Sequence, residues 1–244
     1  MINKILRSVI SLVLMFSVLI CTVPEKAECS EYTVDEVTDL IDGIVSYRLS
    51  QTGSGSIQDW INGDITENAG TLSEWYAITL SQNGYTDMSS YENALKKYLH
   101  SNDILSASSR LKYALALSAA GSTDSLITEY LDNATGQQGI MSWIYGLHLL
   151  NNGYTSSAYT RGSVISTLLS LQLQDGGWAL FGEYGDIDVT AMTVNALAPS
   201  ADSDADVKSA IDRALSFLSE HQESDGGYRS FGTANPESAS QVLT

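Results

Sequence analysis

Along most of the chain, apolar residues recur three or four positions apart, which places them on one face of an α-helix. Ile41, Ile44 and Val45 follow this spacing early in the chain, and Phe217 and Leu218 complete a similar face near its end. No two segments read as a convincing pair of strands. The pattern predicts an all-α protein with about ten helices of roughly 10–17 residues.

The predicted helices also carry residue types that begin and end helices. In a capping box, a Thr or Ser hydroxyl and a Glu carboxylate three residues later bond the free backbone N–H groups of the first turn. A glycine after an apolar run accepts the left-handed conformation that ends a helix. The predicted starts are Thr33–Glu36, Thr71–Glu74, Ser89–Glu92, Ser203–Asp206 and Asn235–Glu237, and the predicted stops are Gly84, Gly121 and Gly153.

One segment recurs fifty residues further along the chain. Asp175-Gly176-Gly177-Trp178 returns as Asp225-Gly226-Gly227-Tyr228. Each copy follows an apolar helix that ends in a glutamine, Gln172 or Gln222. We expect the Gln amide to bond carbonyl groups at the helix end and N–H groups in the glycine turn, with the aromatic ring packed over that turn. The residues assigned to this structural repeat are Gln172, Gly176, Gly177, Trp178, Gln222, Gly226, Gly227 and Tyr228.

The repeating unit is a two-helix hairpin, and about five copies are visible. Hairpins that each bury one face against their neighbours stack into a solenoid or close into a ring. The sequence therefore predicts an architecture of stacked helical hairpins.

The first 29 residues differ from the rest of the chain. Lys4 and Arg7 precede an apolar run over residues 8–23, which is shorter than the roughly twenty residues of a membrane-spanning helix. Ala-Glu-Cys at residues 27–29 offers the small residues that a signal peptidase reads. We therefore predict that residues 1–29 are a Sec-type signal peptide, which places the protein outside the cell or on its surface. An uncleaved membrane anchor is the alternative.

The net charge of −17 at pH 7 limits the partners. A surface this acidic repels phosphate backbones and anionic lipid headgroups, which excludes nucleic acid. Both cysteines, Cys21 and Cys29, lie in the predicted leader, so the mature chain has no thiol for a disulfide, a catalytic thiolate or a Cys-ligated zinc ion. His100, His148 and His221 are scattered along the sequence. We predict no metal, no cofactor and, after cleavage of the leader, no membrane span.

The segment from Arg213 to Tyr228 reads Arg-Ala-x-x-Phe-Leu-x-x-x-Gln-x-x-x-Gly-x-Tyr. It resembles, position for position, the glutamine–tryptophan repeat of squalene and oxidosqualene cyclases, with Tyr228 where that family prefers Trp. A second copy begins at Arg161 and lacks the aromatic residue in mid-helix. The repeats are similar also to those of protein prenyltransferase β subunits and of the helical domain of transcobalamin-type binders. The resemblance is close over residues 157–244 and diffuse over residues 33–156.

This resemblance implies an α/α toroid, in which inner and outer rings of helices surround a central cavity. A closed ring takes roughly six hairpins or more, and about five are visible. We therefore expect one toroid domain over residues 30–244 that is incomplete, because the chain is truncated within a helix.

A second motif, Asp186-Ile187-Asp188-Val189-Thr190-Ala191, resembles the Asp-x-Asp-Asp-Thr-Ala motif of class II terpenoid cyclases. In that family the middle carboxyl protonates an alkene or epoxide, so the resemblance implies Asp188 as general acid and Asp186 as its partner. Val189 replaces the last Asp, which removes one group that tunes the acid. The alternative is that Asp188 is an ordinary acid at the positive N-terminal end of a helix. Protein prenyltransferases need a zinc-ligating Cys, which the mature chain lacks.

Inner helices of a toroid present their N-terminal ends at the mouth of the cavity, and here those ends carry aromatic and acidic residues. Such a lining suits a ligand with an apolar body and polar or cationic groups. Alternatively, the aromatic residues fill the interface between inner and outer helices. The candidate ligand-binding residues are Glu74, Trp75, Trp143, Tyr145, Asp186, Asp188 and Glu237.

Two functions follow from these observations. The first is an exported, non-catalytic toroid that binds an unknown small molecule or a surface partner. The second is a terpenoid-cyclase-like enzyme that acts on a polyprenyl substrate, with Asp188 as the general acid. The acid missing at Val189, the leader and the single short domain favour the first. A glycan-processing enzyme is a third alternative and would need paired carboxylates in the cavity.

Overall fold

The computed structural model describes residues 33–85, 87–230 and 232–243. Within this part of the chain almost all regular structure is helical, which confirms the predicted all-α class. The exception is a hairpin of two short antiparallel strands, β1 (Arg229–Ser230) and β2 (Thr233–Ala234), where the sequence pattern predicts none. The predicted leader, residues 1–29, and its cleavage site lie outside the described residues.

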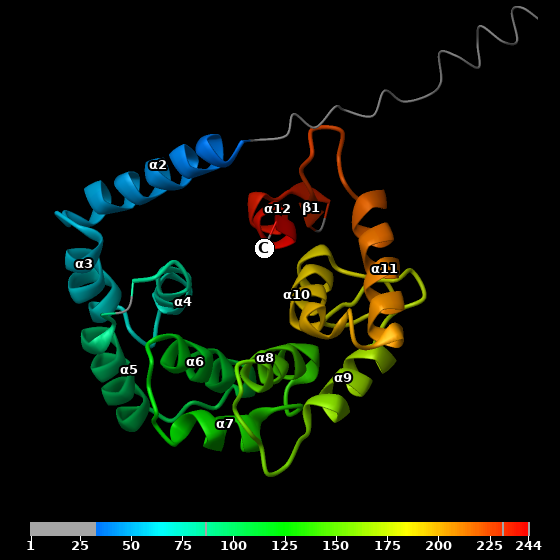
Figure 1. Ribbon diagram of the computed structural model, residues 1–244, viewed down its shortest axis with the longest axis horizontal. Helices are drawn as coiled ribbons and strands as arrows, with labels where there is room; N and C mark the ends of the chain where they lie inside the picture. Colours follow the sequence, from blue (N-terminus) through cyan, green and yellow to red (C-terminus); the bar gives the residue numbers. More distant parts are fainter. Residues whose placement is uncertain (1–32, 86, 231, 244) are drawn as a thin grey trace, which may run out of the picture.

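The helices lie in two rows along an open arc (Figure 1). Each inner helix packs against the next one, α4 on α6, α6 on α8, α8 on α10 and α10 on α12, as stacked hairpins do. The described residues do not close the arc into a ring, and the incomplete toroid stays a prediction. The outer row contains α2 (Val34–Thr52), α3 (Ile57–Trp60) with a π-helical turn (Ile61–Ile65), α5 (Ser89–Ser101), α7 (Leu126–Ala134), α9 (Arg161–Ser170) and α11 (Ala205–Glu220). The inner row contains α4 (Glu74–Gln82), α6 (Ala107–Ala119), α8 (Gly139–Asn151), α10 (Ile187–Leu197) with a 3₁₀ turn (Ala198–Ser200), and α12 (Pro236–Leu243).

A continuous apolar core joins the two rows. Leu131 of α7 and Ile144 and Leu147 of α8 are among its fully buried side chains. Gly146 allows α8 to approach the end of α7, because a Cβ there would lie 2.6 Å from the hydroxyl oxygen of Thr135. Burial of a side chain of this size contributes about 1.5–3 kcal/mol relative to leaving it exposed.

The two copies of the repeat fold in the same way, as the sequence predicts. The side-chain nitrogen Nε2 of Gln172 donates to the carbonyl of Gly176 at 2.8 Å, and that of Gln222 donates to the carbonyl of Gly226 at 3.0 Å. Both glycines adopt the left-handed conformation, with φ of 90° and 83°. Thus the same hydrogen bond and the same backbone conformation close both turns.

The first copy is also bonded to the next outer helix. Gln172 donates a second bond to the carbonyl of Ala210 at 2.8 Å, and its oxygen accepts a bond from the guanidinium of Arg213. The expected bonds to carbonyls at the end of its own helix and to N–H groups of the glycine turn are not made within the described residues: the carbonyls that Gln172 bonds belong to the turn and to α11, and the N–H of Gly177 is taken by the carboxylate of Asp175 at 3.0 Å. The glutamine therefore links neighbouring repeats as well as closing its own turn.

We expect Gln172→Ala to destabilise the protein by about 2 kcal/mol and Gln222→Ala by about 0.5 kcal/mol, at roughly 0.5–1.5 kcal/mol for each hydrogen bond lost. Gln172 makes three side-chain bonds, whereas Gln222 makes one within the described residues. Urea denaturation followed by circular dichroism measures both. Equal losses would contradict a role for Gln172 between repeats.

The predicted helix stops are confirmed. Gly84, Gly121 and Gly153 each follow a helix, with φ of 89°, 77° and 88°. Two starts are confirmed as well. Thr33 and Glu36 form the predicted capping box, and the side chain of Asn235 accepts a hydrogen bond from the backbone N–H of Glu237 in α12.

Three other starts differ from the prediction in detail. α4 begins at Glu74, without a capping box at Thr71. At α5 no side chain caps the first turn, because the Ser89 hydroxyl donates to Asp87 instead. At α11 the capping side chain is Asp204, one residue later than predicted. A capping pattern is local in sequence, and these side chains find other partners.

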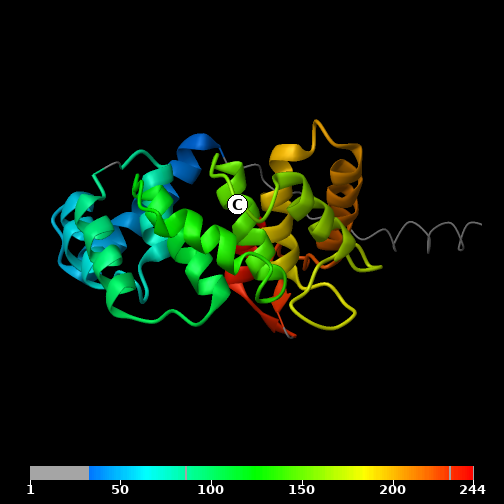
Figure 2. The same ribbon diagram turned by 90° about the horizontal axis from the view of Figure 1, so that it is seen from below.

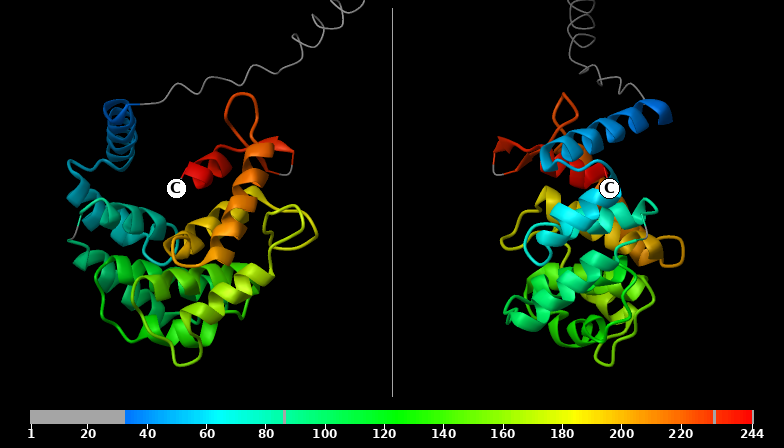
Figure 3. Two further views of the ribbon diagram at one scale, coloured as in Figure 1. Left: turned by 45° about the vertical axis from the view of Figure 1, so that its right-hand side comes forward. Right: turned by 90° about the vertical axis from the view of Figure 1, so that its left-hand side faces the viewer.

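One end of the arc exposes an apolar helix face. α2 packs mainly against α3, and Figure 3 shows it standing apart from the remaining helices. Leu40, Ile41, Ile44 and Tyr47 are each more than half exposed. The apolar face that the sequence predicts on this helix is therefore present, but no described residue covers these side chains.

A loop between Trp178 and Asp186 stands out on the same side of the arc as the β1–β2 hairpin (Figure 2). At its base the N–H of Asp186 donates to the carbonyl of Trp178 at 2.8 Å. The N–H of Gly185 donates to the carboxylate of Asp175 at 2.7 Å. At its tip Phe181 is 79% exposed and Tyr184 is 82% exposed. The loop is thus anchored at its ends and exposed at its tip.

Candidate functional site

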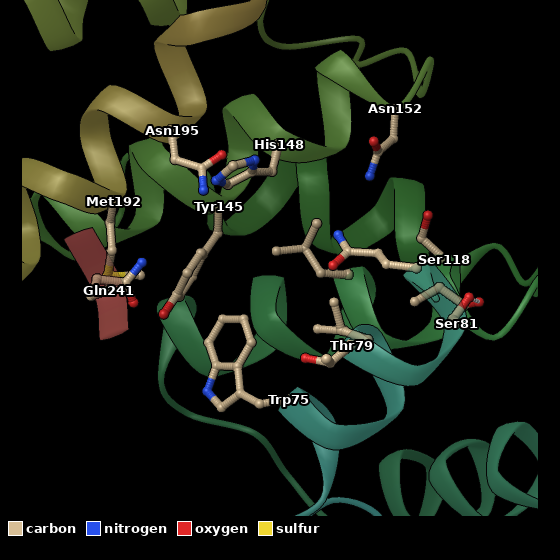
Figure 4. Close-up of a pocket in the computed structure, with 14 residues that line it drawn as sticks. Trp75, Thr79, Ser81, Ser118, Tyr145, His148, Asn152, Met192, Asn195 and Gln241 are labelled. Carbon is tan, nitrogen blue, oxygen red and sulfur yellow. Dashed lines mark hydrogen bonds between the residues drawn. The ribbon is translucent and has the colours of Figure 1, made fainter. Parts of the chain in front are cut away.

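All five inner helices line one cavity on the concave side of the arc (Figure 4). Its volume of about 530 Å³ lies within the range of roughly 300–1,000 Å³ that is typical of small-molecule sites. The cavity is lined by Trp75, Ile78, Thr79, Ser81, Gln82, Leu115, Ser118, Ala119, Tyr145, His148, Asn152, Met192, Asn195 and Gln241.

Helical spacing explains why these side chains share the cavity. On α8 and the residue after it, Tyr145, His148 and Asn152 follow one another at intervals of three and four residues, which keeps them on one face. On α10, Met192 and Asn195 are three residues apart. The opposite faces of both helices carry the apolar residues that pack into the core.

Two aromatic rings form one wall of the cavity. The ring centroids of Trp75 and Tyr145 lie 6.0 Å apart, with the planes at 55°. Trp75 is 48% exposed, so a large part of its indole is free to contact a ligand. Burial raises the pKa of Tyr145 to about 12, which keeps its hydroxyl protonated and neutral at physiological pH.

The rest of the lining combines the apolar side chains of Ile78, Leu115, Ala119 and Met192 with polar ones, and most of the polar side chains make no hydrogen bond within the described residues. Among the described residues, the Ser81 hydroxyl donates to the carbonyl of Ala119 at 2.5 Å. Asn195 and His148 both line the cavity (Figure 4), and neither side chain makes a hydrogen bond within the described residues. The other lining side chains that make no hydrogen bond within the described part of the chain are Thr79, Gln82, Ser118 and Asn152.

No lining residue carries a charge at neutral pH. The lining contains no Asp, Glu, Lys or Arg, and burial lowers the pKa of His148, which keeps its imidazole neutral. A neutral imidazole offers one donor and one acceptor. The cavity therefore combines an aromatic wall with uncharged hydrogen-bonding groups.

Of the seven predicted ligand-binding residues, Trp75 and Tyr145 line the cavity. Trp143, on the other side of α8, packs edge-to-face against Tyr159 with centroids 5.5 Å apart. Its ring also covers Gly136, where a Cβ would lie 2.4 Å from it. Trp143 therefore packs against the loops on either side of α8 and does not line the cavity.

Glu74 does not reach the cavity. Its side chain is 1% exposed, and its carboxylate accepts the backbone N–H of Gly70 at 2.7 Å and the ammonium of Lys112 at 3.1 Å. The hydroxyl of Tyr113 donates to the carbonyl of Gly70 at 2.7 Å. The acid is thus part of an internal network that holds the loop before α4.

The predicted acids Asp186, Asp188 and Glu237 lie at the N-terminal ends of α10 and α12, the last two inner helices. Asp186 caps α10 by accepting the N–H of Val189 at 3.0 Å. Glu237 is exposed in the first turn of α12. Asp188 has one carboxylate oxygen, Oδ1, that is buried and has no hydrogen-bond partner among the described residues. Asp188 lies on the α10 face that continues to Met192 four residues later, although Asp188 itself is not a lining residue.

The acidic residues at the N-terminal ends of the inner helices, which the sequence predicts at the mouth of the cavity, therefore do not line it. Most of the polar lining residues come from the C-terminal halves of the inner helices, whereas Glu74 is engaged in an internal network, Asp186 caps α10, and neither Asp188 nor Glu237 lines the cavity. Sequence reasoning missed the polar wall of His148, Asn152 and Asn195. His148 and Asn152 follow Tyr145 at intervals of three and four residues, and this helical spacing is the sequence pattern that could have placed them on the same face.

Comparison with protein-family models, curated proteins and solved structures finds nothing that matches this chain. Within the described residues, no three His, Cys, Asp or Glu side chains converge as metal ligands. No described helix is long and apolar enough to cross a membrane. The chemistry of the cavity itself is thus the basis for a functional proposal.

Proposed function

We propose that this chain is an exported protein of the squalene-cyclase and prenyltransferase repeat type, which binds an uncharged small molecule in the cavity without altering it. The observation that carries the proposal is the uncharged lining contributed by all five inner helices. Apart from the neutral imidazole of His148, the lining offers contacts and hydrogen bonds, and it contains no carboxylate, thiol or amine to transfer a proton or to attack a substrate. The toroid resemblance and the leader support export and a binding role.

The test uses the protein secreted from its full-length gene, and its intact mass reports whether the leader is removed before residue 30. We expect the purified protein to retain a small molecule, detected by native mass spectrometry. Ser118→Trp places an indole in the cavity and should lower the retained fraction at least about tenfold, because the bulky ring competes for the same space. Ser166→Trp, on the exposed side of α9, is the matched control and should leave retention unchanged.

Equal retention by the two Trp variants, with both folded by circular dichroism, would place any binding outside the cavity. Absence of a retained molecule from the unmodified protein, together with absence of binding to any added compound, would overturn the proposal.

A terpenoid-cyclase-like enzyme is the second candidate, and one observation favours it: the buried, unbonded Oδ1 of Asp188. Two features oppose it. Val189 stands where the cyclase motif has its last acid, and the net charge of −17 disfavours a diphosphate substrate. A cyclised product from squalene, oxidosqualene or geranylgeranyl diphosphate that disappears in Asp188→Asn would replace the binding proposal with this one.

A further inference from the structure

We infer that the ligand of the cavity is a neutral saccharide, an inference that rests on the proposed binding function. A pyranose ring has an apolar C–H face and a rim of hydroxyls, each of which both donates and accepts a hydrogen bond. The cavity offers both kinds of contact: Trp75 and Tyr145 lie on one wall, and uncharged polar groups lie among apolar side chains in the rest of the lining.

The aromatic wall suits the apolar face of a sugar. Trp75 is 48% exposed and is held at its edge by Tyr145, with 6.0 Å between centroids. In Figure 4 the two rings lie at the same end of the cavity. A rigid, partly exposed indole gives a large contact area with little loss of side-chain freedom.

The polar wall suits hydroxyl groups because it contains donors and acceptors together. An Asn or Gln amide has one acceptor oxygen and two N–H donors, and a neutral imidazole has one of each. Asn195 and His148 line the same cavity from neighbouring inner helices, and Asn152 is on the same helix face as His148. These groups make no hydrogen bond within the described residues, so they are available to neighbouring hydroxyls of one ligand.

Other ligand classes fit less well. A hydrocarbon would remove these amides and hydroxyls from water without bonding them, at roughly 1–3 kcal/mol for each group. An anionic ligand would meet no Lys or Arg in the lining and a net charge of −17 around it. An extended peptide pairs best with an open strand edge or a groove, whereas these polar groups surround a concave site.

The test applies the secreted full-length product to an array that carries both neutral and acidic glycans, followed by titration calorimetry with the best neutral glycan. We expect neutral glycans to bind, and Trp75→Ala to weaken binding about tenfold or more, because the stacking surface is lost. Asn195→Leu removes the amide at similar size and should weaken binding by about tenfold. Tyr184→Ala, on the exposed loop outside the cavity, is the control and should bind like the unmodified protein.

The outcomes separate this inference from the proposed function. Retention of an uncharged lipid or peptide that Ser118→Trp abolishes would overturn the saccharide inference and leave the binding function intact, whereas retention of an acidic compound in the cavity would overturn both. Neutral-glycan binding that survives both Trp75→Ala and Asn195→Leu would place the sugar elsewhere and overturn it as well. An empty array, with nothing retained by the purified protein, would overturn both.

Discussion

Replacing Trp178 by Ala should lower the free energy of unfolding by about 3–5 kcal/mol, the usual cost of deleting a large buried aromatic side chain. Trp178 is fully buried, and its indole N–H donates to the carbonyl of Leu168 at 2.8 Å. Its backbone N–H is bonded to the hydroxyl of Thr190 at 2.9 Å, which joins the turn to α10. Removal of the ring would therefore leave a void, and the Leu168 carbonyl would keep only its bond from the N–H of Leu171 at 3.2 Å.

The second copy of the repeat supplies the comparison for this variant. Tyr228 is 6% exposed, belongs to a smaller apolar cluster, and makes no side-chain hydrogen bond within the described residues. We expect Tyr228→Ala to cost about 2 kcal/mol less than Trp178→Ala. Urea denaturation followed by far-ultraviolet circular dichroism measures the difference. A loss below about 1 kcal/mol for Trp178→Ala would show that the ring does not hold the repeat together.

Replacing Glu74 by Ala should lower the free energy of unfolding by about 3 kcal/mol, because removal of one partner of a buried ion pair strands the other. The carboxylate is 1% exposed, and its loss leaves the N–H of Gly70 and the ammonium of Lys112 without their partner. Since Lys112 is 22% exposed, water recovers only part of the loss. Glu74→Gln keeps an acceptor for Gly70 and should cost less.

A double-mutant cycle makes this expectation specific to the pair. Lys112→Met added to Glu74→Ala should recover part of the lost stability, because no unpaired charge remains near the core. Ligand retention by folded Glu74→Gln should equal that of the unmodified protein, since this carboxylate lies outside the cavity. Retention that falls with Glu74→Gln while stability is kept would return Glu74 to the ligand-binding residues predicted from the sequence.

Local patterns in the sequence predict the helices and the turns well. Gly84, Gly121 and Gly153 end their helices as expected, because left-handed backbone is a property of the glycine itself. Capping is less predictable: Glu74 carries the box pattern behind Thr71, yet its carboxylate bonds a lysine 38 residues away. No local pattern contains that partner.

The cavity residues, too, depend on contacts between segments that are far apart in the sequence. Asn151 and Asn152 are adjacent and chemically identical in sequence. In the fold, the Asn151 amide donates to the carbonyl of Ala196 at 2.9 Å and accepts a bond from Arg161 at 2.7 Å, whereas Asn152 faces the cavity. Which of the two meets a ligand is decided by the direction in which α8 is rotated against its neighbours. That rotation depends on packing across repeats.

The neighbour-to-neighbour packing of the inner helices has a consequence for cooperativity of folding. Trp75 on α4 and Gln241 on α12 line the same cavity, yet their helices are joined through the intervening repeats. In such an array the end repeats unfold more readily than the middle ones, and unfolding spreads from the ends. A ligand that contacts both helices links the first and the last inner helix of the described residues directly, so its binding free energy is lost as soon as either helix separates from its neighbours. Occupation of the cavity would thus make the unfolding of the whole arc more nearly a single cooperative transition.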